Sequence, residues 1–279
     1  MERIKVKDVI KAMEEIAPPE FALQGDRIGL QVGDEEGKAE VILLSLDVTQ
    51  KVVKEAKEKK ANLIISHHPL IYHPLKKITF QEWPSGVLRE LIKNDISLYV
   101  AHTNLDIAPG GVNDALLKTL KKFLRIKKEK PLHLSSEKNS QPLGWLIFLE
   151  KEETLIEIAE KVKKALSCTS MRISGGRKEK IARIALCAGS GRDLIYPARD
   201  KKAQLLITGE LSYHSLLEAD FLGLSVIEAG HYETEVVVLP LLKEKLEKKL
   251  REKNQESKIL LSEIPTRPYL TESITQVDI

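Results

Sequence analysis

Short aliphatic runs that end in polar residues constrain the fold of this chain more than any other feature. Residues 61–65 read Ala-Asn-Leu-Ile-Ile and are followed directly by Ser66-His67-His68-Pro69. Such a run is typical of a strand buried on both faces of a parallel sheet. Because Pro69 cannot donate a backbone hydrogen bond to a sheet, both histidines are predicted to lie on a loop at the carboxyl end of this strand. Ligands of open α/β sheets bind at that edge.

The neighbouring segments bring further polar residues to the same edge. A strand predicted over 41–47 and an amphipathic helix over 49–60 precede the histidine pair, and this order implies a right-handed crossover with parallel pairing. The next strand, predicted over 96–101, ends at His102, and Asp106 follows shortly after. Taken alone, the histidine pair would be read as two polar loop residues. With His102 and Asp106 at the same edge, a functional site becomes the better interpretation.

The second half of the chain contains more alternating helices and strands. The basic stretch 121–130 lacks interleaved aromatic residues, so we interpret it as a solvated boundary segment and not as a nucleic-acid patch. The loop Gly189-Ser190-Gly191 falls far short of a phosphate-binding fingerprint and is predicted to be a tight turn. Strands are expected over 143–149, 181–188, 203–208, 222–228 and 258–261, and helices over 154–166 and 241–253.

His231 and Glu235 form a second group with metal-ligand chemistry. They are four residues apart at the predicted start of a helix, which places both side chains on one face. The pair could be a surface contact, but the apolar run 236–238 indicates a helix whose body is buried. Gly230 permits the unusual backbone that a strand-to-helix switch needs.

Imidazole and carboxylate ligands together suit zinc, iron, manganese or nickel better than calcium or magnesium. Five such ligands exceed what one catalytic ion with an open position requires, and they suit two divalent metal ions per subunit. A purely structural zinc site is disfavoured, because such sites usually have cysteine-rich coordination. The ligands are His67, His68, Asp106, His231 and Glu235.

Composition limits the cellular compartment and the classes of partner that we expect for this chain. The net charge of +3 over 279 residues does not require a nucleic-acid partner. Two cysteines, Cys168 and Cys187, are too few for a disulfide scaffold and fit a reducing cytoplasm. The amino terminus lacks a secretory apolar segment, and no apolar run approaches the roughly 20 residues that span a bilayer. We therefore expect a cytoplasmic protein without a membrane partner.

Several motifs resemble those of the NIF-three-like dinuclear metal-binding family, short form, whose members carry the name GTP cyclohydrolase 1 type 2 homologue. The resemblance departs in the early loop, where members commonly have Trp-Asp-Asn before Gly-Leu-Gln-Val-Gly. This chain has Gly25-Asp26-Arg27-Ile28 there, so no substrate contact is carried over to that loop. The matching motifs are Ser66-His67-His68-Pro69-Leu70-Ile71-Tyr72, Ala101-His102-Thr103-Asn104-Leu105-Asp106, Gly111-Val112-Asn113-Asp114, Thr208-Gly209-Glu210 with Tyr213-His214, and Gly230-His231-Tyr232-Glu233-Thr234-Glu235.

The resemblance implies an α/β fold with two α/β lobes, built on mixed, mainly parallel sheets flanked by helices, and a metal site between the lobes. Residues 1–126 and 228–279 would form lobe one, which carries most of the metal ligands. Residues 127–227 would form lobe two, the central α/β domain. Members of the family assemble into a toroidal homohexamer with metal sites that face an internal cavity.

The resemblance also implies roles for individual residues. His68 and Asp106 would hold one ion. His67 and His231 would hold the other, and Glu235 would bridge both. Three further residues would either orient the ligands or serve as general acids and bases: His102, His214 and Glu210.

Two functions remain open at this point. The first is a dinuclear metal-dependent hydrolase, GTP cyclohydrolase-like, that acts on a nucleotide or a phosphorylated heterocycle through metal-bound hydroxide. The second is a non-catalytic, toroidal metal-binding scaffold that binds a protein or DNA partner in its ring. The near-neutral charge argues against DNA. Fold alone does not decide between an enzyme and a scaffold.

Overall fold

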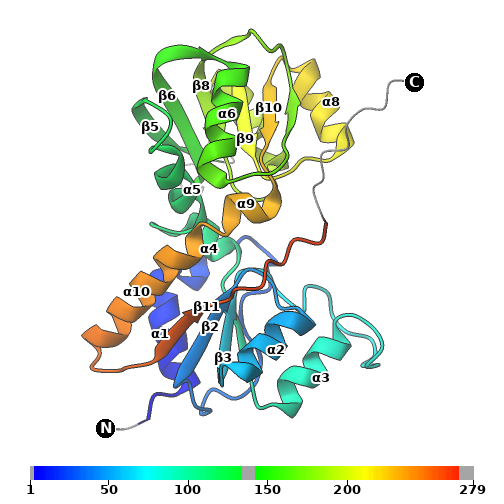
Figure 1. The fold of residues 1–279 in the computed structure, drawn as a ribbon, viewed down its shortest axis with the longest axis vertical. Coiled ribbons are helices and arrows are strands. Elements are labelled where there is room, and N and C mark those ends of the chain that lie inside the picture. Colours follow the sequence, from blue (N-terminus) through cyan, green and yellow to red (C-terminus); the bar gives the residue numbers. More distant parts are fainter. Residues whose placement is uncertain (1–2, 134–141, 270–279) are drawn as a thin grey trace. The chain divides into compact units, whose positions relative to one another are not determined.

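Two mixed β-sheets, each in its own unit, organise the chain. The structure, a computed structural model, describes residues 3–133 and 142–269. Unit 1 consists of Met1–Ala115 and Val236–Thr266, and unit 2 consists of Leu116–Glu235 and Arg267–Ile279. Helices flank both sheets (Figure 1), which confirms the predicted α/β fold class.

The sheet of unit 1 has five strands in the order β1-β4-β3-β2-β11. Strands β4, β3, β2 and β11 are parallel, as predicted from the strand–helix–strand order, and β1 pairs antiparallel with β4. The bounds are β1 Gly29–Val32, β2 Val41–Ser45, β3 Leu63–Ser66, β4 Ser97–Val100 and β11 Lys258–Leu261.

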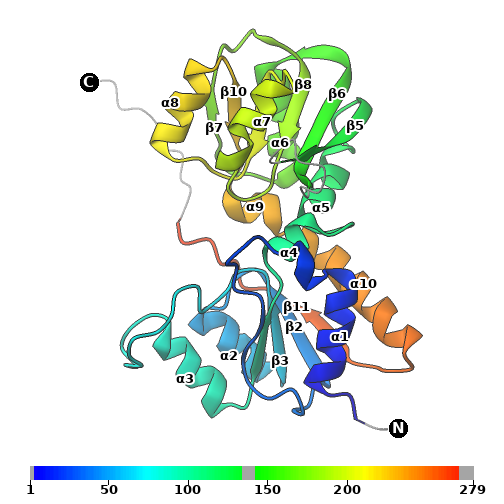
Figure 2. The ribbon, with the colours of Figure 1, turned by 180° about the vertical axis from the view of Figure 1, so that it is seen from behind.

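Helices cover both faces of this sheet. Helices α2 and α3 lie on one face, and α1 and α10 lie on the other (Figures 1 and 2). A short helix, α4, follows β4, and α5 begins in unit 1 and ends in unit 2. The bounds are α1 Val6–Ile16, α2 Gln50–Glu58, α3 Ser85–Lys93, α4 Thr103–Ile107, α5 Val112–Leu120 and α10 Val238–Glu252, with a 3₁₀ helix at Pro19–Phe21.

The core of unit 1 fixes the strand register that later positions the site. Leu43, Ile64 and Leu98 are side-by-side partners on β2, β3 and β4, and all three are fully buried in the cluster beneath α2 and α3. Burying each such side chain contributes about 1.5–3 kcal/mol, so a shifted register would be strongly unfavourable. The same register aligns Ser66 with Val100, which brings the residues after β3 and β4 next to each other.

The sheet of unit 2 has six strands in the order β5-β6-β8-β9-β10-β7. Its centre, β8-β9-β10, is parallel, whereas the three outer pairings are antiparallel. The mainly parallel character expected for both sheets therefore describes unit 1 better than unit 2. The bounds are β5 Ile126–His133, β6 Pro142–Thr154, β7 Arg172–Ser174, β8 Lys180–Leu186, β9 Leu205–Thr208 and β10 Ser225–Glu228.

The helices of unit 2 pack on both faces of its sheet. Helix α6 covers one face (Figure 1), and α7 covers the other (Figure 2). Thr154 caps the start of α6, where its side chain and that of Glu157 satisfy each other's backbone N–H groups. The bounds are α6 Leu155–Leu166, α7 Ile195–Asp200, α8 Tyr213–Phe221 and α9 His231–Glu235, with a 3₁₀ helix at Arg192–Leu194.

Two expectations about segments differ from the structure. The basic stretch 121–130, read as a solvated boundary, runs into the edge strand β5, whose lysines face solvent. Lysines are a common feature of edge strands because they discourage pairing with other chains. Residues 116–126, 228–235 and 267–269, expected in lobe one, lie in unit 2, so His231 and Glu235 belong to the second unit. Among the described residues, no helix is both long and apolar enough to cross a membrane.

Candidate metal centre

Three histidines of unit 1 converge at the carboxyl edge of its sheet. His67 and His68 follow β3, and His102 follows β4. One ring nitrogen of each lies within 4.8 Å of those of the other two. The ring centroids are 4.8 Å apart for His67 and His68, 5.2 Å for His67 and His102, and 5.8 Å for His68 and His102. The register of β3 and β4 thus produces the predicted convergence.

Each of these rings has its Nδ1 atom held by an oxygen that can only accept a hydrogen bond. In the neutral imidazole this contact favours the tautomer with the proton on Nδ1, in which Nε2 keeps the lone pair that a metal ion needs. The contacts are His67 to the Ala101 carbonyl oxygen at 2.9 Å, His68 to Asp47 Oδ1 at 2.9 Å and His102 to Asp26 Oδ1 at 2.8 Å.

Asp26 holds more than one group at this edge. Its Oδ2 atom accepts hydrogen bonds from the backbone nitrogen of Thr103 at 3.0 Å and from the Thr103 hydroxyl at 2.5 Å. The Asp26 side chain is only 4% exposed. Burial alone would raise the pKa of this carboxyl, but hydrogen bonds from His102 and Thr103 outweigh it and hold the pKa well below its usual range. Asp26 is therefore a carboxylate that orients His102.

Sequence reasoning missed Asp26 and Asp47 as parts of the site. Asp26 lies in the early loop that departs from the family pattern, and Asp47 lies just after β2. A signal for Asp47 was available in the sequence, because this residue closes the run 41–47 at the same sheet edge as the histidines. Asp47 is also tied to the Thr266 hydroxyl, which connects the end of unit 1 to this edge.

Asp106 joins the cluster from α4. Its Oδ1 atom lies 3.5 Å from His67 Nε2, and its backbone nitrogen donates to the His102 carbonyl oxygen at 3.1 Å. The side-chain amide of Asn113 donates to the Asp106 carbonyl oxygen at 3.1 Å. The four predicted residues of this edge are thus brought together within unit 1.

Unit 2 places His231 and Glu235 on one face of α9, as their spacing predicts. His231 Nε2 lies 3.1 Å from Glu235 Oε1, and His231 Nδ1 lies 3.2 Å from Glu210 Oε1. The Glu235 side chain is buried, whereas His231 is 33% exposed and Glu210 is 58% exposed. Glu210 orients His231 in the way that the carboxylates of unit 1 orient theirs. His214 is exposed on α8 and belongs to neither group of candidate ligands among the described residues.

Two glycines make room for α9. A Cβ atom at Gly189 would lie 2.2 Å from Glu235 Oε1, and Gly189 has a φ of 59° that favours glycine. A Cβ atom at Gly209 would lie 2.9 Å from the Cα atom of His231. The Gly189-Ser190-Gly191 loop therefore accommodates a carboxylate, which the sequence analysis did not foresee.

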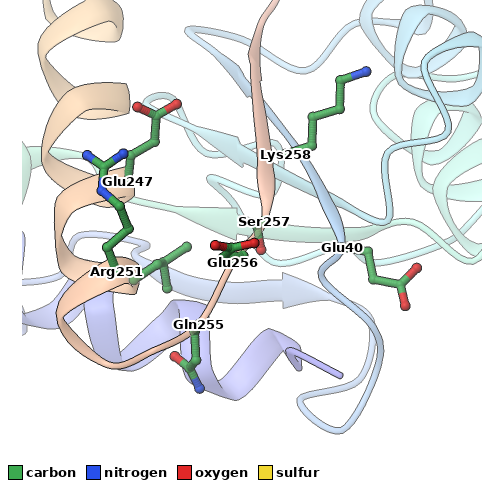
Figure 3. A pocket seen from close by; sticks show the side chains of 8 residues that line it. Glu40, Glu247, Arg251, Gln255, Glu256, Ser257 and Lys258 are labelled. Carbon is green, nitrogen blue, oxygen red and sulfur yellow. The ribbon is translucent and has the colours of Figure 1, made fainter. Parts of the chain in front are cut away.

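A cavity elsewhere in unit 1 lacks the clustered metal-ligand side chains of the histidine edge. It has a volume of about 390 Å³ and lies between α10 and the amino ends of β2 and β11, at the opposite edge of the sheet from the histidines. Glutamate and arginine side chains of mixed charge line it (Figure 3), and histidine is absent from its lining. This cavity offers no set of metal ligands among the described residues.

The donors at both places fit divalent transition metals. Neutral imidazole nitrogens with carboxylate oxygens suit zinc, iron, manganese and nickel, and the orienting groups fix the tautomer that ligation requires. In unit 1 one ring nitrogen from each of three histidines lies within 4.8 Å of the others, a group that could hold a metal ion. The residues therefore fit the ions that the sequence predicts.

Comparison with known proteins identifies relatives over nearly the whole chain. The family model described as Duf34/NIF3 (NGG1p interacting factor 3) matches residues 4–268. A Clostridium perfringens protein named GTP cyclohydrolase 1 type 2 homolog is 38% identical over 247 residues, which cover 88% of this chain and 93% of the relative. A crystal structure of a Bacillus cereus protein related to NIF3 has a TM-score of 0.89 at 26% identity, covering 98% of this chain and all of that one. Reduced HcgD from Methanocaldococcus jannaschii has a TM-score of 0.76 at 31% identity, covering 95% of this chain and 100% of that one.

Proposed function

Because the chain belongs to the Duf34/NIF3 family, we propose that it is a dinuclear metal-dependent hydrolase, GTP cyclohydrolase-like, that acts on a nucleotide or a phosphorylated heterocycle. The observation that carries the proposal is the three-histidine cluster, whose Nδ1 atoms are all held by acceptors. A structural histidine needs no such uniform arrangement. A metal ligand does, since its other nitrogen must keep a lone pair directed at the ion.

Five residues would hold two divalent ions. The proposed ligands are His67, His68 and Asp106 in unit 1 and His231 and Glu235 in unit 2. The pairing that the resemblance implies, His68 with Asp106, is kept in this proposal, and the 3.5 Å distance between His67 Nε2 and Asp106 Oδ1 supports the nearness of His67 to this group. The metals are zinc, iron, manganese or nickel.

The bound ions would activate water and polarise an electrophile. The chain's own residues would hold and move protons around them. His102, with its proton kept on Nδ1 by Asp26, would present Nε2 as a proton acceptor. Glu210 would keep His231 in the tautomer that coordinates through Nε2. His214 is exposed on α8, so a role as a proton carrier would require a substrate that extends to that helix.

A non-catalytic scaffold is the second candidate, and the surface of α8 favours it. Tyr213, Leu217 and Phe221 follow one another at four-residue spacing and are all exposed. Such an apolar stripe is typical of a face that contacts another protein. We propose that a scaffold of this kind binds a protein partner or further copies of this chain in a homohexameric toroid, in preference to DNA. The two cysteines, Cys168 and Cys187, are buried, and so small a number of them fits a cytoplasmic location.

A turnover experiment separates the two candidates. The protein is loaded with zinc, iron, manganese or nickel, and hydrolysis of GTP and of a panel of phosphoesters is followed. We expect metal-dependent turnover that falls by at least about 100-fold in Glu235→Gln. Glu247→Gln on α10, which alters a glutamate remote from the ligands, serves as the matched control. If the loaded protein hydrolyses no compound of the panel, the hydrolase proposal is wrong and the scaffold gains support.

A further inference from the structure

A second cavity, lined only by residues of unit 2, lies beside the proposed ligand His231. Its volume is about 390 Å³, within the usual range of small-molecule sites of about 300–1,000 Å³. Its wall combines hydroxyl, carboxylate, guanidinium and aromatic groups with two glycines. The lining includes Ser170, Arg172, Glu228, His231, Glu233 and Tyr269.

Arg172 is the only lysine or arginine among the lining residues that the structure describes. It begins the edge strand β7 and is the register partner of Glu228 on β10. Its Nη2 atom donates to Glu228 Oε1 at 2.6 Å and to the Leu211 carbonyl oxygen at 3.2 Å. The Glu228 carboxylate also accepts from the backbone nitrogen of Leu211 at 2.7 Å. One corner of the guanidinium is therefore fixed by a strand and a loop.

The rest of the guanidinium is open to a ligand. The Arg172 side chain is 65% exposed, although its partner Glu228 is only 4% exposed. A buried carboxylate that holds one nitrogen leaves the remaining N–H groups in a fixed orientation. Such a pre-organised fork matches the oxygens of a phosphate or a carboxylate group.

Two other carboxylates of the cavity each lie beside a side-chain nitrogen. Arg267 Nε lies 2.7 Å from Glu233 Oε1 in an ion pair, and Glu210 Oε1 lies 3.2 Å from His231 Nδ1. An anionic group beside Arg172 therefore need not displace either carboxylate from its partner. The hydroxyl of Ser170, also in the lining, can add a hydrogen bond to an anion.

We infer that this cavity is the substrate pocket of unit 2 and that Arg172 binds the phosphate of a phosphorylated organic substrate there. The inference rests on the proposed function, which it deepens by naming the group that the pocket recognises. The volume exceeds the needs of an inorganic ion, and Met171 and Tyr269 supply apolar surface for the organic part. Glu228 is the positioning residue that holds Arg172.

The alternative is that Arg172 only neutralises the buried Glu228. The two readings differ in what a double variant does. Removing both charges with Arg172→Gln and Glu228→Gln eliminates the need for neutralisation, so folding stability should recover relative to Arg172→Gln alone. Phosphate recognition should stay lost, because the guanidinium is gone.

Binding is measured by calorimetric titration of the full-length, metal-loaded protein with GMP, guanosine and inorganic phosphate. We expect Arg172→Gln to weaken the binding of GMP and phosphate by about 10- to 100-fold and to leave guanosine unaffected. The double variant should show the same loss. Arg177→Gln, an exposed arginine outside the lining, should bind as the wild type does. Metal content is determined for each variant to exclude indirect effects.

Three outcomes would overturn the inference. In the first, Arg172→Gln binds GMP within about twofold of the wild type. In the second, the double variant regains GMP binding together with stability. In the third, the wild-type protein binds GMP no more tightly than guanosine. Turnover is scored separately, so a protein that binds through Arg172 but hydrolyses nothing contradicts the hydrolase proposal and leaves the binding site standing.

Discussion

The two places that carry metal ligands are built with different degrees of rigidity. In unit 1 three imidazoles are held by a backbone carbonyl and two carboxylates, of which Asp26 is 4% exposed and Asp47 is 37% exposed. In unit 2 the single imidazole of His231 is held by Glu210, which is 58% exposed. Water can replace an exposed orienting group but not a buried one. Unit 1 is therefore the pre-organised half, and unit 2 is the adaptable half that also contains the pocket.

The largest effect is expected when an imidazole is removed from the rigid half. His67→Ala should lower metal affinity by more than about 100-fold, because a ligand is lost from a buried cluster that cannot recruit a substitute. Isothermal titration with zinc provides the measurement. His133→Ala on the exposed end of β5 is the control and should leave zinc affinity unchanged. An unaltered affinity in His67→Ala would show that the cluster is not the primary site.

A smaller effect is expected from the groups that orient the ligands of unit 1. Asp26→Asn keeps the size of the side chain but weakens the acceptor of His102 Nδ1, so metal affinity should fall by about 10- to 100-fold. Asp95→Asn changes an exposed carboxylate at a positive φ that asparagine tolerates, and it should have no effect. Equal affinities for these two variants in the same titration would refute the orienting role of Asp26.

A substitution at Gly189 can separate the effect of backbone strain on stability from an effect on the metal affinity of the site. Gly189→Ala and Gly223→Ala both place alanine at a positive φ, and each should destabilise the protein by about 1–2 kcal/mol. A Cβ atom meets Glu235 at Gly189 but nothing within 4 Å at Gly223. Only Gly189→Ala should therefore also lose metal affinity, by about tenfold, through displacement of Glu235. Chemical denaturation and metal titration together distinguish the two, and similar metal affinities would argue against Glu235 as a ligand.

The smallest effect is expected in the adaptable half. Glu210→Gln should lower metal affinity by less than about tenfold, because solvent can take the place of the exposed carboxylate beside His231 Nδ1. The measurement is the same titration used for Asp26→Asn. A loss in Glu210→Gln as large as that in Asp26→Asn would remove the contrast between the two units.

The sequence predicted those parts of the site that follow from local patterns. The aliphatic runs before His67 and His102 implied neighbouring parallel strands, and the register of β3 and β4 brings the two together. The four-residue spacing of His231 and Glu235 correctly placed them on one helical face. Each of these inferences depended on a helical spacing or on the residue at which a strand ends, and a sequence displays both directly.

The missed parts depend on contacts between residues far apart in the chain. Asp26 meets His102 across 76 positions, and Arg172 meets Glu228 across 56. No periodicity marks such pairs, because they result from the order of strands in each sheet. The same holds for Gly189, whose missing side chain matters only once α9 packs against it.

The most direct test of the dinuclear centre is the number of metal ions bound per chain, determined by elemental analysis after reconstitution and dialysis. We predict about two divalent ions in the wild-type protein and fewer in both His67→Ala and Glu235→Ala, since each removes a proposed ligand from a different unit. Absence of bound metal in the reconstituted wild type, or an unchanged metal content in both variants, would contradict the account.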